Sequence, residues 1–179
     1  MKGIIFTEFL DIVEDSFGLE VCQEMLELAN DDGVYTAVGS YDHNDLVKLI
    51  ISLGKVTGIS TETLQEIYGE AVFPRLYRTL PKLDKFQQDT FSFIKSVEEH
   101  IHTEVKKLYP DATPPHFDFL SETKSHMLMD YKSARCMSHV CKGLIKGCAK
   151  HFHQNVQITM EPINKKQSHV RFSIDLIME

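Results

Sequence analysis

The sequence has no long apolar run. Its apolar stretches, such as Leu49 to Leu53, are far shorter than the ~20 residues that a membrane-spanning helix requires. Acidic residues at Glu8 and Asp11 follow the opening apolar residues, so no signal-peptide core develops. With 179 residues, 42% hydrophobic and 25% charged, the chain is long enough for one sizeable core, or at most two fused subdomains. We therefore expect a soluble, cytoplasmic, globular protein.

Positive charge is also scarce. The formal net charge of -7 argues against a nucleic-acid-binding module, which needs a concentrated positive face. The charge is uneven, because Met1 to Asp32 is strongly acidic whereas Lys142 to Arg171 is basic. The basic stretch either meets an acidic protein partner or forms a solvated helix face and a lysine-bearing turn, and both interpretations stay open.

Cysteines are few, and none forms a Cys-x-x-Cys pair. Cys141 and Cys148 would lie roughly 10 Å apart along one helix, too far for a disulfide, so we expect reduced, buried thiols. A zinc site made by Cys148, His151 and His153 lacks the paired ligand spacing of structural zinc motifs and is disfavoured.

Signatures of catalysis are missing as well. The chain has no Gly-rich phosphate loop, no histidine-kinase or cyclase signature, and no Ser-x-x-Lys or Gly-x-Ser-x-Gly nucleophile pattern. We therefore predict that the chain is not an enzyme.

Helical apolar spacing dominates the first two thirds of the chain. Glu8 to Ala29 predicts two short helices broken at Gly18, and Asp31 to Gly33 is a turn signal. Ser60 has N-cap chemistry for a helix to about Val72, which Phe73-Pro74 either continues or kinks. Further helices are predicted over Asn44 to Leu53 and, after a loop opened by Pro81, over Asp84 to Leu108.

After Pro114-Pro115 the spacing of apolar residues changes from helical to alternating. Two alternating segments flank a turn, and a helix and two more alternating segments follow, the last pair around the turn Asn164 to Gln167. The predicted fold is α+β, a helical N-terminal subdomain packed on an antiparallel sheet of about four strands crossed by one helix. The predicted strands are His116 to Leu120, His126 to Lys132, Val156 to Met160 and Val170 to Ile177, and the predicted helix is Ala134 to Phe152.

Three polar side chains stand in a Tyr-x-Ser-x-Arg array at Tyr131, Ser133 and Arg135. Arginine can fork onto one carboxylate while a phenol and a hydroxyl donate to a second, so the triplet suits a planar ligand with two propionates. A histidine upstream could hold the metal of the same macrocycle, which indicates a haem pocket. Taken alone, the same alternation also describes a solvated strand edge.

Nine histidines compete for the role of metal ligand. At about 100° per residue, His102 and His100 lie on opposite margins of the apolar stripe of the Asp84 to Leu108 helix. A histidine at a core margin is more often a hydrogen-bonded structural residue than an iron ligand, so helical geometry favours His102 only slightly.

The chain resembles the haem nitric oxide/oxygen binding (H-NOX) family, which includes the haem domain of soluble guanylate cyclase and many bacterial sensors. The resemblance covers essentially the whole chain. It is carried by Met1 to Phe6, His102 with Tyr109-Pro110 seven residues on, Ala112-Thr113-Pro114-Pro115, the Tyr131, Ser133 and Arg135 array, and Gly143-Leu144.

The resemblance implies a single domain over residues 1–179, with a helical subdomain to about residue 65 and haem b between it and the remainder. His102 is then the iron ligand, Tyr131, Ser133 and Arg135 clamp the propionates, and Pro115 presses on the porphyrin. His100 does not match the ligand position.

The resemblance also implies which gas is sensed. Bound oxygen gains from a hydrogen-bond donor, whereas nitric oxide binds ferrous iron tightly without one. Oxygen-binding members have a tyrosine where this chain has Val140, and Leu144, Ile5 and Phe9 resemble the remaining apolar distal wall. Ser138 and His139 would donate only if the helix were rotated. We therefore predict a sensor that binds nitric oxide, and also CO, but excludes oxygen.

Nitric oxide is expected to weaken or break the iron bond to His102, and the resulting shift to regulate a separate protein. The resemblance implies a sensor histidine kinase or a cyclic-di-GMP enzyme as partner, and a monomeric sensor. Two alternatives remain, an oxygen-binding or redox haem protein and an interaction module without a cofactor.

Overall fold

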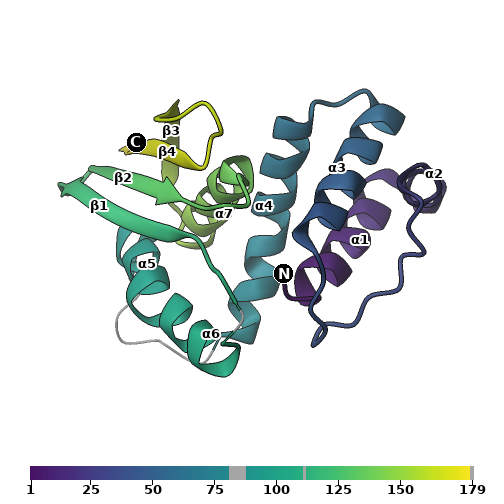
Figure 1. Ribbon diagram of the computed structural model, residues 1–179. Helices are drawn as coiled ribbons and strands as arrows, with labels where there is room; N and C mark the ends of the chain where they lie inside the picture. Colours follow the sequence, from purple (N-terminus) through teal and green to yellow (C-terminus); the bar gives the residue numbers. More distant parts are fainter. Residues whose placement is uncertain (81–87, 111, 178–179) are drawn as a thin grey trace.

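A computed structural model describes residues 1–80, 88–110 and 112–177, and the fold is α+β as predicted. The N-terminal helices lie on one side, the sheet lies on the other, and α4 and α7 run side by side between them (Figure 1). The helical elements are α1 (Ile4–Phe17), α2 (Leu19–Ala29), α3 (His43–Thr57), α4 (Thr61–Thr79), α5 (Thr90–Ser96), the π-helical η1 (Val97–Ile101), α6 (His102–Leu108) and α7 (Ser138–His151), and the strands are β1 (His116–Glu122), β2 (His126–Lys132), β3 (Asn155–Pro162) and β4 (His169–Ile177).

The predicted breaks between the N-terminal helices are confirmed. Gly18 separates α1 from α2 with a φ of 88°, a backbone angle that glycine adopts without a steric penalty. The Asp31 side chain accepts a hydrogen bond from the Gly33 amide at 2.9 Å, which closes the predicted turn. The Ser60 hydroxyl accepts from the Thr63 amide at 3.2 Å and caps α4.

Helix α4 continues beyond Val72, which is one of the two outcomes expected for Phe73-Pro74. It passes through Pro74 without stopping and ends at Thr79. Buried packing of Val72 and Phe73 holds this turn in place although proline removes one backbone donor. The loop predicted at Pro81, and the predicted helix start at Asp84, lie outside the described residues.

The predicted long helix is interrupted by a π-helical turn. Asp89 caps its start through a capping box with Ser92, and α5 then passes into η1 at Val97. The His102 amide donates to the Val97 carbonyl five residues earlier, so one extra residue is accommodated immediately before His102. Regular 100° spacing therefore does not describe the side-chain directions beyond this point.

The four strands form an antiparallel sheet in the order β1-β2-β4-β3. Alternate residues face inward, as the period-two pattern predicted, and Met127, Met129 and Phe172 are fully buried. The register between β1 and β2 shifts between Phe119 and Ser121, and this bulge leaves Leu120 exposed. Strand β1 forms one edge of this sheet.

The predicted start of the last helix at Ala134 is wrong. Helix α7 begins at Ser138, because Cys136 adopts a left-handed backbone with a φ of 52°. Cys136 consequently lies outside the helix and is exposed, contrary to the expectation of a buried thiol. The other cysteines are free and buried as predicted: Cys22, Cys141 and Cys148.

Part of the basic C-terminal stretch is paired within the chain. Lys142 and Lys146 on α7 both bind the carboxylate of Glu66 on α4. These ion pairs flank the place where the two helices pack, so the lysines contribute to α4–α7 packing rather than forming a wholly solvated face.

Three apolar cores hold the elements together. The first lies among α1 to α4, the second between the inner face of the sheet, α5 and α7, and the third where Phe73, Phe93 and Cys148 meet. Helix α4 contributes to the first and third cores, and the subdomain boundary near residue 65 stays a prediction. Among the described residues, no helix is both long and apolar enough to cross a membrane.

Candidate functional site

A cavity of about 320 Å³ opens where the three cores meet, a size typical of sites for small molecules and cofactors. Most of its wall is apolar. The predicted site residues that line it are Ile5, His102, Pro115, Tyr131, Ser133, Arg135, Val140 and Leu144.

His102 reaches the cavity from the first turn of α6. Its side chain is 13% exposed, and its ring lies 5.3 Å from the ring of Phe117, centroid to centroid. Burial lowers the pKa of His102, although the neighbouring Glu98 opposes this, so the neutral ring is favoured near pH 7. A neutral imidazole is the form that binds a metal. His100 is exposed and does not line the cavity.

Glu98 holds the Nδ1 side of the His102 ring, with its Oε2 atom 3.0 Å from Nδ1. Burial disfavours the charged carboxyl, but hydrogen bonds from His102, His116 and the Phe117 amide outweigh it and lower the pKa of Glu98. Because a carboxylate only accepts hydrogen bonds, Nδ1 carries the ring proton and the lone pair stays on Nε2. His102 is thereby prepared to bind a metal through Nε2.

The predicted anion clamp is assembled at the end of β2. Tyr131 is the penultimate residue of the strand and is buried, whereas Ser133 and Arg135 lie in the loop before α7. Burial raises the pKa of Tyr131 well above neutrality. Its phenol is therefore protonated and can donate to an anion. Arg135 donates to the Thr113 hydroxyl at 3.1 Å, which orients the guanidinium near the cavity.

Much of the apolar wall is built from α4 and α7, and α1 adds Ile5. Ile5, Val140 and Leu144 contribute to it as expected. Phe9 does not line the cavity. One turn further along α1, its ring turns into the first core and packs edge-on against Tyr68 at 5.3 Å, so it supports the wall from behind.

Ser138 and His139, the two residues that could have placed a hydrogen-bond donor in the wall, do not line the cavity. Ser138 is fully buried elsewhere, and its hydroxyl has no hydrogen-bond partner among the described residues. His139 is partly exposed on α7, near Glu62. The start of α7 at Ser138 thus directs Val140 and Leu144, rather than these polar neighbours, toward the cavity.

Two phenols in the wall were not identified from the sequence. Tyr68 donates its hydroxyl proton to the Ile5 carbonyl at 2.8 Å. Tyr77 stacks on Phe73 and packs at a tilt against Phe93 in the third core. Its ring lies 4.3 Å from the His151 ring, centroid to centroid. Both lie on α4 with the helical spacing that is typical of core residues. No local pattern therefore distinguishes them as residues that line a cavity. Glu98 was missed for a similar reason, because glutamates are frequent on helix surfaces.

A model of the Haem-NO-binding family matches residues 2–160. The chain belongs to this family. The resemblance seen in the sequence is therefore confirmed, and with it the assignment to a family of haem-based gas sensors.

Solved H-NOX structures agree with the family assignment. An unliganded Fe(II) H-NOX protein from K. algicida is 37% identical over 100% of this chain and 98% of its own, with a TM-score of 0.92. One from S. oneidensis in the Fe(II)NO state is 29% identical over 99% and 100%, with a TM-score of 0.87. One from Shewanella woodyi in the Fe(II)CO state is 31% identical over 98% and 94%, with a TM-score of 0.81. No curated protein matches the chain.

The cavity of this Haem-NO-binding protein fits a haem in its chemistry. A porphyrin is flat and apolar, and the wall is apolar. Its two propionates need donors, which Tyr131, Ser133 and Arg135 provide together at one place. Its iron needs a neutral imidazole, and His102 offers Nε2. These donors reach a single cavity from α6, from β2 and from the loop after β2.

Proposed function

We propose that this protein is a nitric oxide sensor and not an enzyme. In this proposal the protein holds haem b, with His102 as the iron ligand. Binding of nitric oxide to the haem then regulates a separate signalling protein. The observation that carries the proposal is the combination of one polar clamp, one metal-competent histidine and an apolar wall at Ile5, Val140 and Leu144.

Each residue has a separate task in this proposal. His102 binds the iron through Nε2, while Tyr131, Ser133 and Arg135 hold the propionates, and Pro115 packs against the porphyrin. Ferrous haem supplies the iron to which nitric oxide and CO bind. Val140 and Leu144 offer no hydrogen-bond donor, whereas a donor would stabilise bound oxygen. The apolar wall therefore favours nitric oxide over oxygen.

The signal would arise at the His102 helix. We infer that nitric oxide binding would weaken or break a bond between His102 and the haem iron, which would release α6 from its anchor at the cavity. Helix α6 follows η1, which packs on β1 through Glu98, and Lys2 at the N-terminus lies over the Tyr109 ring at 3.6 Å. A shift of α6 would therefore reach both the sheet and the N-terminal helices. A sensor histidine kinase or a cyclic-di-GMP enzyme is the proposed recipient.

Oxygen titration of the purified ferrous protein tests the proposal. We expect a Soret band that shifts with nitric oxide and with CO but stays unchanged in air-saturated buffer. A stable oxygen complex would contradict the proposed selectivity. Tyr77→Phe would then show whether the Tyr77 phenol is the donor, since that variant would lose the complex. Protein purified without any Soret band, and unable to take up added haem, would instead favour an interaction module without a cofactor.

A further inference from the structure

Glu98 accepts three hydrogen bonds. Its Oε2 atom lies 3.0 Å from His102 Nδ1 and 3.2 Å from the Phe117 amide, and its Oε1 atom lies 2.6 Å from His116 Nδ1. The side chain is 20% exposed. The carboxylate therefore joins the proposed iron ligand to two residues of β1.

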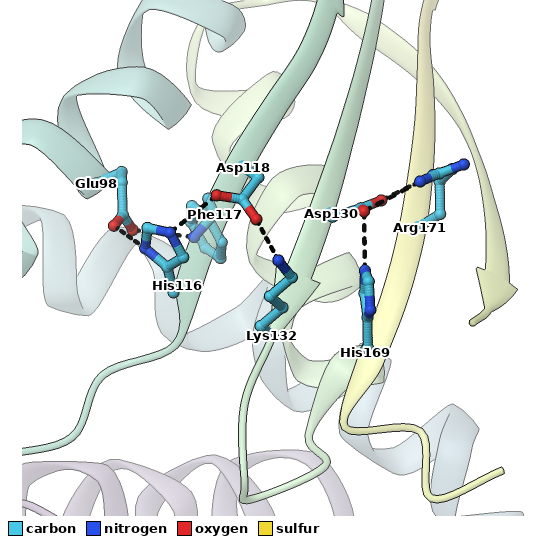
Figure 2. Close-up of polar contacts among 8 residues, drawn as sticks. All are labelled: Glu98, His116, Phe117, Asp118, Asp130, Lys132, His169 and Arg171. Atoms are coloured by element: carbon cyan, nitrogen blue, oxygen red, sulfur yellow. Dashed lines mark hydrogen bonds and ion pairs between the residues drawn. The ribbon is translucent and has the colours of Figure 1, made fainter. Parts of the chain in front are cut away.

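The edge of the sheet is what makes this arrangement possible. Phe117 belongs to β1, which ends the sheet. Among the described residues no strand lies along its outer side, so strand pairing leaves this amide without a partner. Glu98 accepts from that amide. Figure 2 shows Glu98 beside the strand, with dashed lines to His116 and to the Phe117 backbone. The contact fixes the carboxylate relative to the rigid sheet rather than relative to its own helix alone.

His116 secures the carboxylate from the solvent side. Its Nε2 atom lies 2.9 Å from Asp118, and Asp118 in turn binds Lys132 on β2 (Figure 2). His116 is 57% exposed, whereas His102 is 13% exposed. A continuous polar chain therefore runs from the cavity, through Glu98, to the outer face of the sheet.

The π-helical turn contributes to the same geometry. Glu98 and His102 lie at the second position of η1 and immediately after its end. The extra residue in this turn brings the His102 ring to the cavity while its Nδ1 atom stays within hydrogen-bond distance of Glu98.

We propose that Glu98 is a positioning residue for the iron ligand: it fixes the His102 tautomer, aims Nε2 into the cavity and makes the imidazole a stronger donor to iron. This inference rests on the proposed haem-sensing function. Carboxylates that accept from a metal-bound histidine raise its basicity and restrict its orientation. Glu98 consequently sets how readily the bond between His102 and the iron is released.

Resonance Raman spectroscopy of the ferrous, ligand-free protein tests the strength of this bond. In Glu98→Gln the iron–histidine stretching band should move to lower frequency, because a neutral amide polarises the ring less. Haem affinity of the apoprotein should fall by about tenfold, the lower end of the range for partners of metal ligands. Glu99→Gln is the matched control, since Glu99 is exposed and adjacent, and it should leave both quantities unchanged. An unshifted band in Glu98→Gln would overturn the proposal.

Nitrogen NMR of the haem-free protein gives a test that does not depend on haem. At neutral pH, wild-type His102 should carry its proton on Nδ1, and Glu98→Gln should increase the population of the other tautomer. Glu98→Asp should restore part of the wild-type population if its shorter carboxylate still reaches the ring. Wild-type His102 protonated on Nε2 would overturn the role of Glu98. Failure of the protein to bind haem, with the Nδ1 tautomer present, would instead contradict the proposed function alone.

Discussion

Gly69 on α4 and Gly143 on α7 lie in direct backbone contact. A Cβ atom placed on Gly143 would lie 2.1 Å from the Glu66 carbonyl oxygen and 2.8 Å from the Gly69 Cα. A Cβ on Gly69 would lie 2.2 Å from the Val140 carbonyl oxygen. The two helices can approach this closely only because both positions lack a side chain. The contact positions Leu144, next to Gly143, and Val140, about one turn earlier on α7, at the cavity wall.

Substitution of Gly143 by alanine should therefore be strongly destabilising. The added methyl group would push two rigid backbones apart, and overpacking of this kind costs about 3 kcal/mol. Urea unfolding followed by circular dichroism measures the change. Lys150→Ala, an exposed position on the same helix, should change the free energy of unfolding by less than about 0.5 kcal/mol. Wild-type stability of Gly143→Ala would contradict the contact.

Val140→Tyr should introduce oxygen binding. The substitution places a phenol donor on the apolar wall, where bound oxygen would accept a hydrogen bond worth about 1 to 3 kcal/mol in a dry site. The absorption spectrum of the ferrous variant in air gives the result, with Val140→Phe as a control of similar size without the hydroxyl. Oxygen binding by both variants would show that size, rather than the donor, controls selectivity.

His102→Gly should separate haem occupancy from signalling. Tyr131, Ser133 and Arg135 remain to hold the propionates, but no imidazole connects the iron to α6. We expect the iron–histidine Raman band to disappear and the regulation of the partner by nitric oxide to be lost. His100→Gly carries the same helix penalty of about 1 kcal/mol and should keep both properties. Full regulation in His102→Gly would refute the coupling.

Asp130 should contribute stability that depends on pH. Hydrogen bonds from Arg171 and His169, at 2.8 Å each, lower the pKa of this buried carboxyl to about 2. A lowered pKa stabilises the fold above the ordinary carboxyl range, and the effect is lost as pH falls from about 4 toward 2. Asp130→Asn should cost about 1 to 2 kcal/mol at pH 7 and progressively less below pH 4.

Urea unfolding across this pH range measures the effect. The matched control is Asp175→Asn, whose carboxylate pairs with His126 at 2.9 Å but is 54% exposed, so its cost should be smaller at every pH. A constant difference between wild type and Asp130→Asn from pH 7 to pH 3 would contradict the assignment.

Much of the fold was predictable because its signals are local. Gly18, Ser60 and the turn at Asp31 act through their own backbone and their nearest neighbours, and each has the predicted role. Strand alternation likewise follows from a period of two, and it placed β2 correctly to the residue. Helix ends were less predictable. Packing keeps α4 helical beyond Pro74, and the left-handed backbone at Cys136 makes α7 begin at Ser138 rather than at Ala134.

In the candidate site, too, some features follow from local sequence and others depend on contacts between distant elements. The residue types of Tyr131, Ser133 and Arg135 suit a doubly anionic ligand, because donor chemistry belongs to each side chain. Taken alone they also suit a solvated strand edge, and it was the family resemblance that joined them to His102 as a haem site. Their meeting at one cavity, the displacement of Phe9 behind Tyr68, and the presence of Tyr77 in the wall depend on contacts between distant elements. So does Glu98, whose role exists only because η1 lies against the open edge of β1. Composition and local spacing carry the chemistry of such a site, whereas its geometry arises from packing and from an extra residue in one helical turn, neither of which a local pattern encodes.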